Sequence, residues 1–424
     1  MRPFLSAVGL LIVISLSQAF GDAIRMLQPT SVRDEAEGVS ASLASPATGA
    51  ATYDSSSRDD ASLEEFLRYQ VEQQKNWKLR LFASGTYRHD SNLFLSKDNP
   101  ESDNMWSARP GFQYSYGQDN STLQLLLDGA TEFNYLEKFT DQNSMNTFLS
   151  TSLTYRLRKL QVKFNGSFTH VTGGDTDVGG QAQRTQLTPN LQVTYNASSK
   201  TRVGLGSQVR LTDYDGLLSS ASYKVGSFFD YAFLPQFRLG LQVNHNWQEV
   251  DESGRQTGED YLVRLEWDGD KKLSASGSMG VQSLHTSGGR DMILPLGALS
   301  LTYDVGPKTS VRASVYAQSQ SSPSLTGQYF QSNGAMLGFE QQIGRKLNIG
   351  TDVGYERSNY ESYSEDLSNS RSDELLFIRP WVKYTLQTHL SLQLFYQYST
   401  NSSSGVGAQE FERGLYGLGF TSSW

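Results

Sequence analysis

The sequence predicts an all-β fold, a closed transmembrane antiparallel up-and-down β-barrel of about eighteen strands, with sixteen as the alternative. Three observations predict it. A period-two pattern runs from Trp77 to Trp424, short turns alternate with long polar connections, and the chain begins with a secretory leader. A closed barrel pairs every strand and so satisfies the backbone polar groups, which a bilayer requires.

The start of the chain has the pattern of a secretory signal peptide, residues 1–19. Arg2 supplies a positive charge, residues 4–16 are apolar, and small residues place cleavage after Ala19 or after Gly21. The apolar run is too short for a spanning helix. The leader therefore predicts export from the cytoplasm.

Two further segments precede the expected barrel at residues 77–424. Residues 22–60 are rich in Ser, Ala and Asp without a sustained period, which predicts a disordered linker. A capping box at residues 62–65 then predicts a short periplasmic helix over residues 61–76. The sequence leaves open whether residues 22–76 enter the barrel and plug it.

Composition excludes several classes of function. The chain has no cysteine, which removes disulfides, thiol catalysis and Cys-ligated metals. Its five histidines are scattered, so neither a metal site nor a cofactor is expected. A net charge of −8 argues against a nucleic-acid partner. Aromatic residues reach 12% while charged residues are only 19%, a balance that suits strands facing lipid on one side and water on the other.

The period-two segments are each long enough to cross a bilayer when tilted. In residues 123–135, 237–247 and 390–398, for example, apolar and polar side chains alternate. The eighteen predicted segments begin near residues 77, 105, 121, 146, 160, 184, 201, 218, 236, 259, 271, 291, 308, 328, 346, 373, 388 and 410.

The connections between these segments differ in length on alternate sides. Short ones such as Leu234-Pro235 carry turn residues, whereas residues 90–104, 173–183, 250–258 and 360–372 are long and polar. Outer-membrane barrels have this asymmetry, with the short turns in the periplasm. Both ends of the barrel are therefore expected on the periplasmic side, which requires an even number of strands.

Four prolines recur in the descending segments. Because proline cannot donate to a sheet ladder, it is expected at strand edges or bulges. Their recurrence predicts positions near the outer ends of the strands. They are Pro110, Pro189, Pro295 and Pro380.

The polar face of the alternation predicts a wet, mixed-charge lumen, because a soluble core could not bury so many charges without dense pairing. These side chains are candidates to line a pore. The alternative is a barrel in which these side chains only stabilise the wall or hold a plug, so that no solute passes. The expected lumen-facing residues are Arg80, Arg88, Asp128, Glu132, Lys163, Arg210, Asp230, Arg238, Arg264, Glu266, Arg312, Asp352 and Glu356.

The apolar face carries aromatic residues near strand ends, which predicts two girdles at the lipid interfaces. These residues are Trp77, Tyr87, Tyr135, Tyr155, Tyr195, Trp247, Trp267, Tyr303 and Tyr398. The last segment alternates through Tyr416, Leu418, Phe420 and Trp424. It resembles the C-terminal signal that the outer-membrane barrel-assembly machinery reads, with Trp in place of the usual terminal Phe.

Catalysis finds little support, and the chain is not expected to be an enzyme. His285 and Ser287 have a His-x-Ser spacing similar to that of outer-membrane phospholipase A. Gly288-Gly289 follows, where that family has Asn-Gly, and the segment lies at a loop edge.

Several segments resemble an uncharacterised bacterial group known as β-barrel porin type 2, whose members often accompany exopolysaccharide systems. The similar residues are 88–94 (RHDSNLF), 177–180 with Arg184-Thr185, and 200–205 continuing to 210–215. The likeness covers the barrel and not the linker. It implies an outer-membrane channel or accessory factor, with polysaccharide as one candidate cargo.

Two functions are therefore expected of a barrel in the bacterial outer membrane. The first is a channel with a mixed-charge aqueous lumen that serves exopolysaccharide export or a related surface system. The second is a closed structural or interaction barrel whose loops bind partners or surface polymer. Expected partners are outer-membrane lipid, the assembly machinery, and polysaccharide or periplasmic export components.

Overall fold

The computed structural model describes residues 76–117, 121–251, 254–269, 272–286, 288–363 and 370–424. The leader, the linker and the helix expected before residue 76 lie outside these residues. The strands are β1 (Trp77–Asp90), β2 (Asp103–Tyr116), β3 (Leu123–Leu136), β4 (Ser144–Arg156), β5 (Leu160–Asp175), β6 (Gly180–Asn196), β7 (Thr201–Tyr214), β8 (Ser220–Leu234), β9 (Phe237–Val250), β10 (Gly254–Gly269), β11 (Leu273–His285), β12 (Asp291–Gly306), β13 (Thr309–Ser321), β14 (Gln328–Ile343), β15 (Leu347–Ser362), β16 (Arg371–Gln387), β17 (Leu390–Gly405) and β18 (Phe411–Ser423). A short 3-10 helix, η1 (Thr140–Gln142), follows β3.

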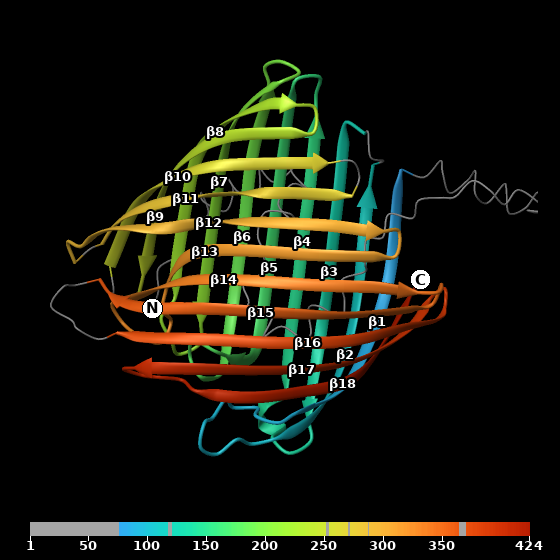
Figure 1. Cartoon of the computed structure of the whole chain (residues 1–424). Coiled ribbons are helices and arrows are strands. Elements are labelled where there is room, and N and C mark those ends of the chain that lie inside the picture. Colours follow the sequence, from blue (N-terminus) through green and yellow to red (C-terminus); the bar gives the residue numbers. More distant parts are fainter. Residues whose placement is uncertain (1–75, 118–120, 252–253, 270–271, 287, 364–369) are drawn as a thin grey trace, which may run out of the picture.

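The eighteen strands form one closed sheet. Each strand pairs antiparallel with its neighbours in the chain, and β1 also pairs with β18, from Phe82 opposite Ser423 to Asp90 opposite Leu415. In Figure 1 the strands of the near wall cross those of the far wall steeply, as expected when tilted strands close on themselves. The predicted all-β barrel of eighteen strands is confirmed.

The barrel has two unlike ends. We call the end with the short connections, such as residues 235–236 and 388–389, the turn end, and the opposite end the loop end. Trp77 starts β1 at the turn end, and the backbones of Leu81 and Trp424 exchange hydrogen bonds there, with N···O distances of 3.0 and 2.9 Å. Both ends of the barrel segment therefore lie on the same side, as the even strand number requires.

Several strands reach further toward the loop end than the alternation predicts. Pairing continues to Asp175 opposite Gly180 in the β5–β6 hairpin, and Gly254 pairs with Val250 in the β9–β10 hairpin. The connections expected at residues 173–183 and 250–258 are consequently shorter than predicted. Their polar residues show no alternation that would predict a strand, because the backbone hydrogen bonds that form it do not require an apolar face.

The expectation for the prolines is wrong for three of the four. Pro110, Pro189 and Pro380 lie near the middle of strands β2, β6 and β16, whereas Pro295 is close to the loop end of β12. At three of the four, the register to the following strand has a gap at the proline and the residue before it. A ring nitrogen has no proton to donate, so the ladder is interrupted locally and resumes beyond it.

Large apolar side chains cover the outside of the barrel. Ile293 is 77% exposed and Leu205 is 64% exposed. Many other large apolar side chains that point outward from the strands are also exposed. An apolar belt of this extent far exceeds the patches that soluble monomers expose. The outer face is therefore built to contact lipid, and the opposite parity faces inward.

Candidate functional site

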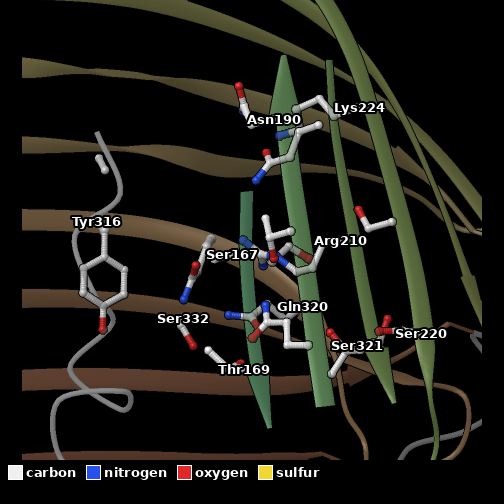
Figure 2. A pocket seen from close by; sticks show the side chains of 18 of the residues that line it. Ser167, Thr169, Asn190, Arg210, Ser220, Lys224, Tyr316, Gln320, Ser321 and Ser332 are labelled. Carbon is white, nitrogen blue, oxygen red and sulfur yellow. The ribbon is translucent and has the colours of Figure 1, made fainter. Parts of the chain in front are cut away.

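The inside of the barrel encloses a cavity of about 1000 Å³. Its lining runs from Gln161 and Arg202 near the turn end to Asp177 and Pro323 in the connections at the loop end. Most of the lining side chains are amides and hydroxyls. Figure 2 shows such groups on β5 to β8, including Ser167, facing the same space as residues of β13 and β14. The cavity is therefore polar along most of its length.

The charged side chains of the cavity are predominantly cationic, although the chain as a whole has a net charge of −8. Nine cationic and five anionic residues give the lining a formal charge of +4. The cations are Arg88, Lys163, Arg184, Arg202, Arg210, Lys224, Arg238, Arg264 and Arg413. The anions are Asp175, Asp177, Asp230, Glu266 and Glu356. A solute inside the cavity therefore meets a field that favours negative charge.

Five of these residues form a compact group near the turn end, the turn-end cluster: Arg202, Asp230, Arg238, Arg264 and Glu266. The Asp230 carboxylate accepts hydrogen bonds from Arg202 Nη2 at 3.1 Å and from Arg264 Nε at 3.0 Å. The Glu266 carboxylate contacts Arg202 and lies 3.8 Å from Arg238 Nε. Strands β7 to β10 each contribute to it, because alternation aims every second side chain inward.

Local packing prepares the position of the turn-end cluster. The Arg264 guanidinium lies 4.3 Å from the ring centroid of Phe228, a cation–π contact that fixes its plane. A Cβ atom at residue 240 would lie 2.1 Å from Asp230 Oδ1, so only Gly240 leaves room for that carboxylate. The cluster is thus held by packing as well as by charge.

A second polar group on the same wall surrounds Asp260, which is 0% exposed. Lys224 Nζ lies 2.8 Å from its carboxylate. The side-chain amides of Asn244, Asn246 and Gln282 donate to it at 3.0, 2.7 and 3.1 Å. This number of donors offsets the cost of burying the charge.

Replacing Asp260 with Ala is expected to destabilise the barrel by about 3 to 5 kcal/mol, since it leaves the Lys224 ammonium and three amides without their acceptor. Samples heated to increasing temperatures and then run on a gel that preserves folded barrels would measure the loss of stability, as the temperature at which the folded band disappears. Asp268→Ala, at the exposed end of the same strand, is the control and should leave that temperature unchanged. Equal temperatures for both variants would contradict this account of Asp260.

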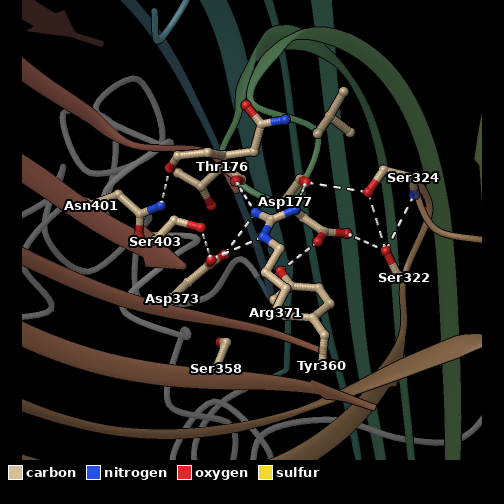
Figure 3. Close-up of polar contacts among 12 residues, drawn as sticks. Thr176, Asp177, Ser322, Ser324, Ser358, Tyr360, Arg371, Asp373, Asn401 and Ser403 are labelled. Carbon is tan, nitrogen blue, oxygen red and sulfur yellow. Dashed lines mark hydrogen bonds and ion pairs between the residues drawn. The ribbon is translucent and has the colours of Figure 1, made fainter. Parts of the chain in front are cut away.

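At the loop end, the β5–β6 connection reaches the opposite wall (Figure 3). Arg371 Nη1 donates to the Asp177 carbonyl oxygen at 3.0 Å. The Asp177 carboxylate accepts from Tyr360 Oη at 2.5 Å and from Ser322 Oγ at 3.3 Å. Arg371 is itself paired with Asp373 at 2.7 Å. The β5–β6 and β15–β16 pairs lie on opposite sides of the ring of strands. The connection between β5 and β6, residues 176–179, therefore crosses the mouth of the lumen.

The β1–β2 connection also folds inward. Leu95 is 2% exposed and packs against Tyr316, Leu375, Phe377 and Phe411, which form an apolar patch on the inner wall. Its backbone has a φ of 52°, a left-handed conformation that non-glycine residues rarely adopt. The burial of the side chain compensates for this strained backbone.

Asn92 holds the base of this connection in place. Its side-chain amide donates to the carbonyl oxygens of Ser96 at 2.7 Å and of Glu412 at 3.0 Å. Gln181 Nε2 donates to the Leu93 carbonyl oxygen, which joins the β1–β2 connection to β6. Together the two inward connections narrow the lumen at the loop end.

The residues expected in the lumen separate into two groups. Eight line the cavity: Arg88, Lys163, Arg210, Asp230, Arg238, Arg264, Glu266 and Glu356. The other five share the inward parity but lie outside the cavity lining: Arg80, Asp128, Glu132, Arg312 and Asp352. Some of these are engaged in wall contacts, such as Glu132 Oε2 with Arg109 Nη1 at 3.8 Å and Asp352 with Arg379 at 3.2 Å.

Several residues that shape the lumen are not among those predicted from the sequence pattern. Arg202 and Lys224 share the parity of Arg210 and Asp230, and Arg413 has the parity opposite to the outward Tyr416, so counting every inward position would have included all three. Asp177 and Leu95 lie in connections, where no period indicates which way a side chain points. Their inward position depends on contacts with strands far away in the sequence.

The outward aromatic residues lie toward both ends of the barrel. Trp77, Tyr155, Tyr195, Trp267 and Tyr303 are exposed near the turn end. Tyr87, Tyr135, Trp247 and Tyr398 lie on the outer face in the half nearer the loop end. On β18 the side chains of Tyr416, Leu418 and Phe420 face outward, and Trp424 is exposed.

His285 Nδ1 lies 2.8 Å from Asp291 Oδ1, at the loop end, and Ser287 lies outside the described residues. The described residues contain no group of three or more His, Cys, Asp or Glu side chains suited to hold a metal ion. Over the same part of the chain, no helix is long and apolar enough to cross a membrane.

Comparisons with known proteins give a likeness to solved barrels. The chain is similar to OccK11 (OpdR) of Pseudomonas aeruginosa, with 12% identity, a TM-score of 0.41, and 82% of this chain and 96% of that chain covered. OpdQ of the same species has 10% identity and a TM-score of 0.44, with coverage of 82% and 98%. OccAB4 of Acinetobacter baumannii has 11% identity and a TM-score of 0.43, with coverage of 83% and 99%. No family model and no curated protein sequence matches the chain.

Proposed function

We propose that this protein is a channel of the bacterial outer membrane that conducts hydrophilic solutes through its polar, mixed-charge lumen. One observation carries the proposal. The cavity of about 1000 Å³ reaches from the turn end to the inward connections, inside a wall whose outer face is apolar. A barrel of this strand number is wide enough to leave water inside.

The orientation of the channel is part of the proposal. Barrels of the outer membrane carry short turns in the periplasm and longer connections outside the cell. The turn end then faces the periplasm, and the connections at residues 91–102 and 176–179 lie on the cell surface. Export by a cleaved leader and insertion by the assembly machinery, through the last strand, belong to the same proposal.

We further propose that the solute class is related to exopolysaccharide. Amide and hydroxyl side chains, which dominate the cavity lining, both donate and accept hydrogen bonds and so match sugar hydroxyl groups. The segments that resemble β-barrel porin type 2 favour the same solute class. Polysaccharide and periplasmic export components are the partners that this proposal implies.

A second candidate function is favoured by the loop end. There the connections pack against the inner wall through buried contacts, with Arg371 and Asp373 1% and 0% exposed. A barrel with a permanently closed mouth would act as a structural or surface-binding protein. Deleting residues 96–101 would then abolish capture of surface polymer and leave conductance at zero.

The experiment that separates the two is conductance in planar bilayers. The purified full-length barrel should give discrete single-channel steps, larger in 1 M than in 0.1 M KCl, because water and ions fill the lumen. A matched barrel denatured before reconstitution is the control. A folded barrel without steps at any salt concentration or voltage would contradict the channel and favour the closed barrel.

A further inference from the structure

We propose that the turn-end cluster is a binding subsite for carboxylate-bearing, hydroxyl-rich solutes such as uronate sugars. In this proposal, the Glu266 carboxylate occupies the position that a solute carboxylate would take. This inference rests on the proposed channel function and deepens it, since it names the solute class and the end of the lumen where the solute is first held.

The two carboxylates of the cluster are held very differently. The Asp230 side chain is 2% exposed and bonded to two arginines, so it is a fixed part of the wall. The Glu266 side chain is 56% exposed, with one close contact to Arg202 and a longer one to Arg238. Exposed ion pairs contribute little stability. Glu266 can therefore leave its position at small cost, whereas Asp230 cannot.

The arginines retain donors for a further acid group. Arg238 Nη1 and Arg202 Nε are buried and have no hydrogen-bond partner among the described residues. A guanidinium presents a planar fork of donors that matches a carboxylate with two parallel hydrogen bonds. The longer 3.8 Å contact of Arg238 with Glu266 leaves this fork only partly used.

Charge balance favours exchange of one carboxylate for another. Three cations and two anions give the cluster a formal charge of +1, and without Glu266 the charge rises to +2. Arg202 and Arg238 both lie within 4 Å of the same Glu266 oxygen, so their repulsion is relieved only when an anion lies between them. An incoming solute carboxylate supplies that anion.

The surroundings of the cluster suit a sugar more than a small inorganic anion. Arg264 Nη1 donates to Gln242 Oε1 at 2.8 Å, which orients the amide at the edge of the site. Thr194 also lines this part of the cavity. These groups can bind hydroxyls beside the carboxylate. The structure thus places an acid-binding fork next to hydroxyl-binding groups.

The test uses the full-length folded protein in detergent, titrated with trigalacturonate, maltotriose and inorganic phosphate by calorimetry. Removing one charge at short range in a solvated site is expected to change affinity by about threefold. Glu266→Gln should bind trigalacturonate about threefold tighter, because the competing carboxylate is gone. Arg238→Gln should bind it at least about threefold more weakly. Arg345→Gln, in the exposed β14–β15 turn, should match the wild type.

Opposite shifts in the two variants support the subsite. Equal affinities in all variants, or shifts of the same sign, overturn it, and so does a wild type that binds maltotriose or phosphate as tightly as trigalacturonate. Among the described residues, the 3.8 Å contact with Glu266 is the only ion pair of Arg238, so its variant should fold. The temperature at which the folded band is lost on the gel checks this. Opposite shifts without conductance would retain the subsite and reject the channel, whereas conductance without shifts would do the reverse.

Discussion

Replacing Arg371 with Ala is expected to increase single-channel conductance severalfold and to lower the stability of the barrel by about 3 to 5 kcal/mol. The guanidinium donates to the carbonyl oxygen of Asp177 and pairs with the buried Asp373. Without it, the connection at residues 176–179 loses its anchor on the opposite wall, and Asp373 keeps an uncompensated buried charge. Planar-bilayer recordings and urea titration in lipid vesicles would measure the two effects.

The control for this prediction is Arg357→Ala. Arg357 lies on the neighbouring strand β15 but faces outward, and its exposed pair with Glu374 spans 3.9 Å. Such a pair contributes about 1 kcal/mol or less. Asp177→Ala separates conductance from stability, because it removes the carboxylate that Tyr360 and Ser322 bind and so loosens the connection, while the Arg371–Asp373 pair stays intact. Unchanged conductance in both lumen variants would show that residues 176–179 do not limit flow.

Replacing Leu95 with Asp is expected to expel the β1–β2 connection from the lumen. The side chain is buried in an apolar patch, and a carboxylate there would lose its hydration without gaining a partner. Removing a buried leucine side chain alone costs about 2 to 5 kcal/mol. The left-handed backbone at this residue, no longer compensated by burial, adds to the drive outward.

The measurement uses the fact that the chain has no cysteine. A single cysteine introduced at Leu93, which is 3% exposed, should react slowly with a bulky maleimide in the otherwise native chain and quickly when Leu95→Asp is present. Asn99→Asp, an exposed position in the same connection, is the matched control and should leave labelling slow. Slow labelling in both would mean that Leu95 does not hold the connection inside.

The sequence predicts the wall of this barrel much better than its interior. Alternation alone places Asp230 and Glu266 on the inner face, because the period of two is fixed by backbone geometry. It does not distinguish the buried, doubly bonded Asp230 from the exposed Glu266, since that difference comes from the arginines that strands β7, β9 and β10 supply. Turn residues likewise predict where strands end at the turn end, where tight reversals require them.

The loop end shows what local pattern cannot predict. Tyr360 and Arg371 meet Asp177 across the barrel, and each is separated from it by more than 180 residues. No single-sequence feature marks such a pairing, because an arginine that anchors a connection has the same appearance as one that faces water. The polar ends of strands β5 and β6 near Asp175 are not predicted for a related reason. Their pairing depends on backbone hydrogen bonds, which leave no pattern in the side chains.

The closed order of the strands has a consequence for how the chain folds. Every strand pairs with its neighbour in sequence except at the seam, where β1 meets β18. There, residues that are distant in the sequence, such as Phe82 and Ser423, pair with each other. Pairings between distant residues form slowly, because a long loop must first lose its entropy. We expect the hairpins to form early and the seam last. Until it closes, two strand edges remain unsatisfied, and the nascent protein is most prone to aggregation.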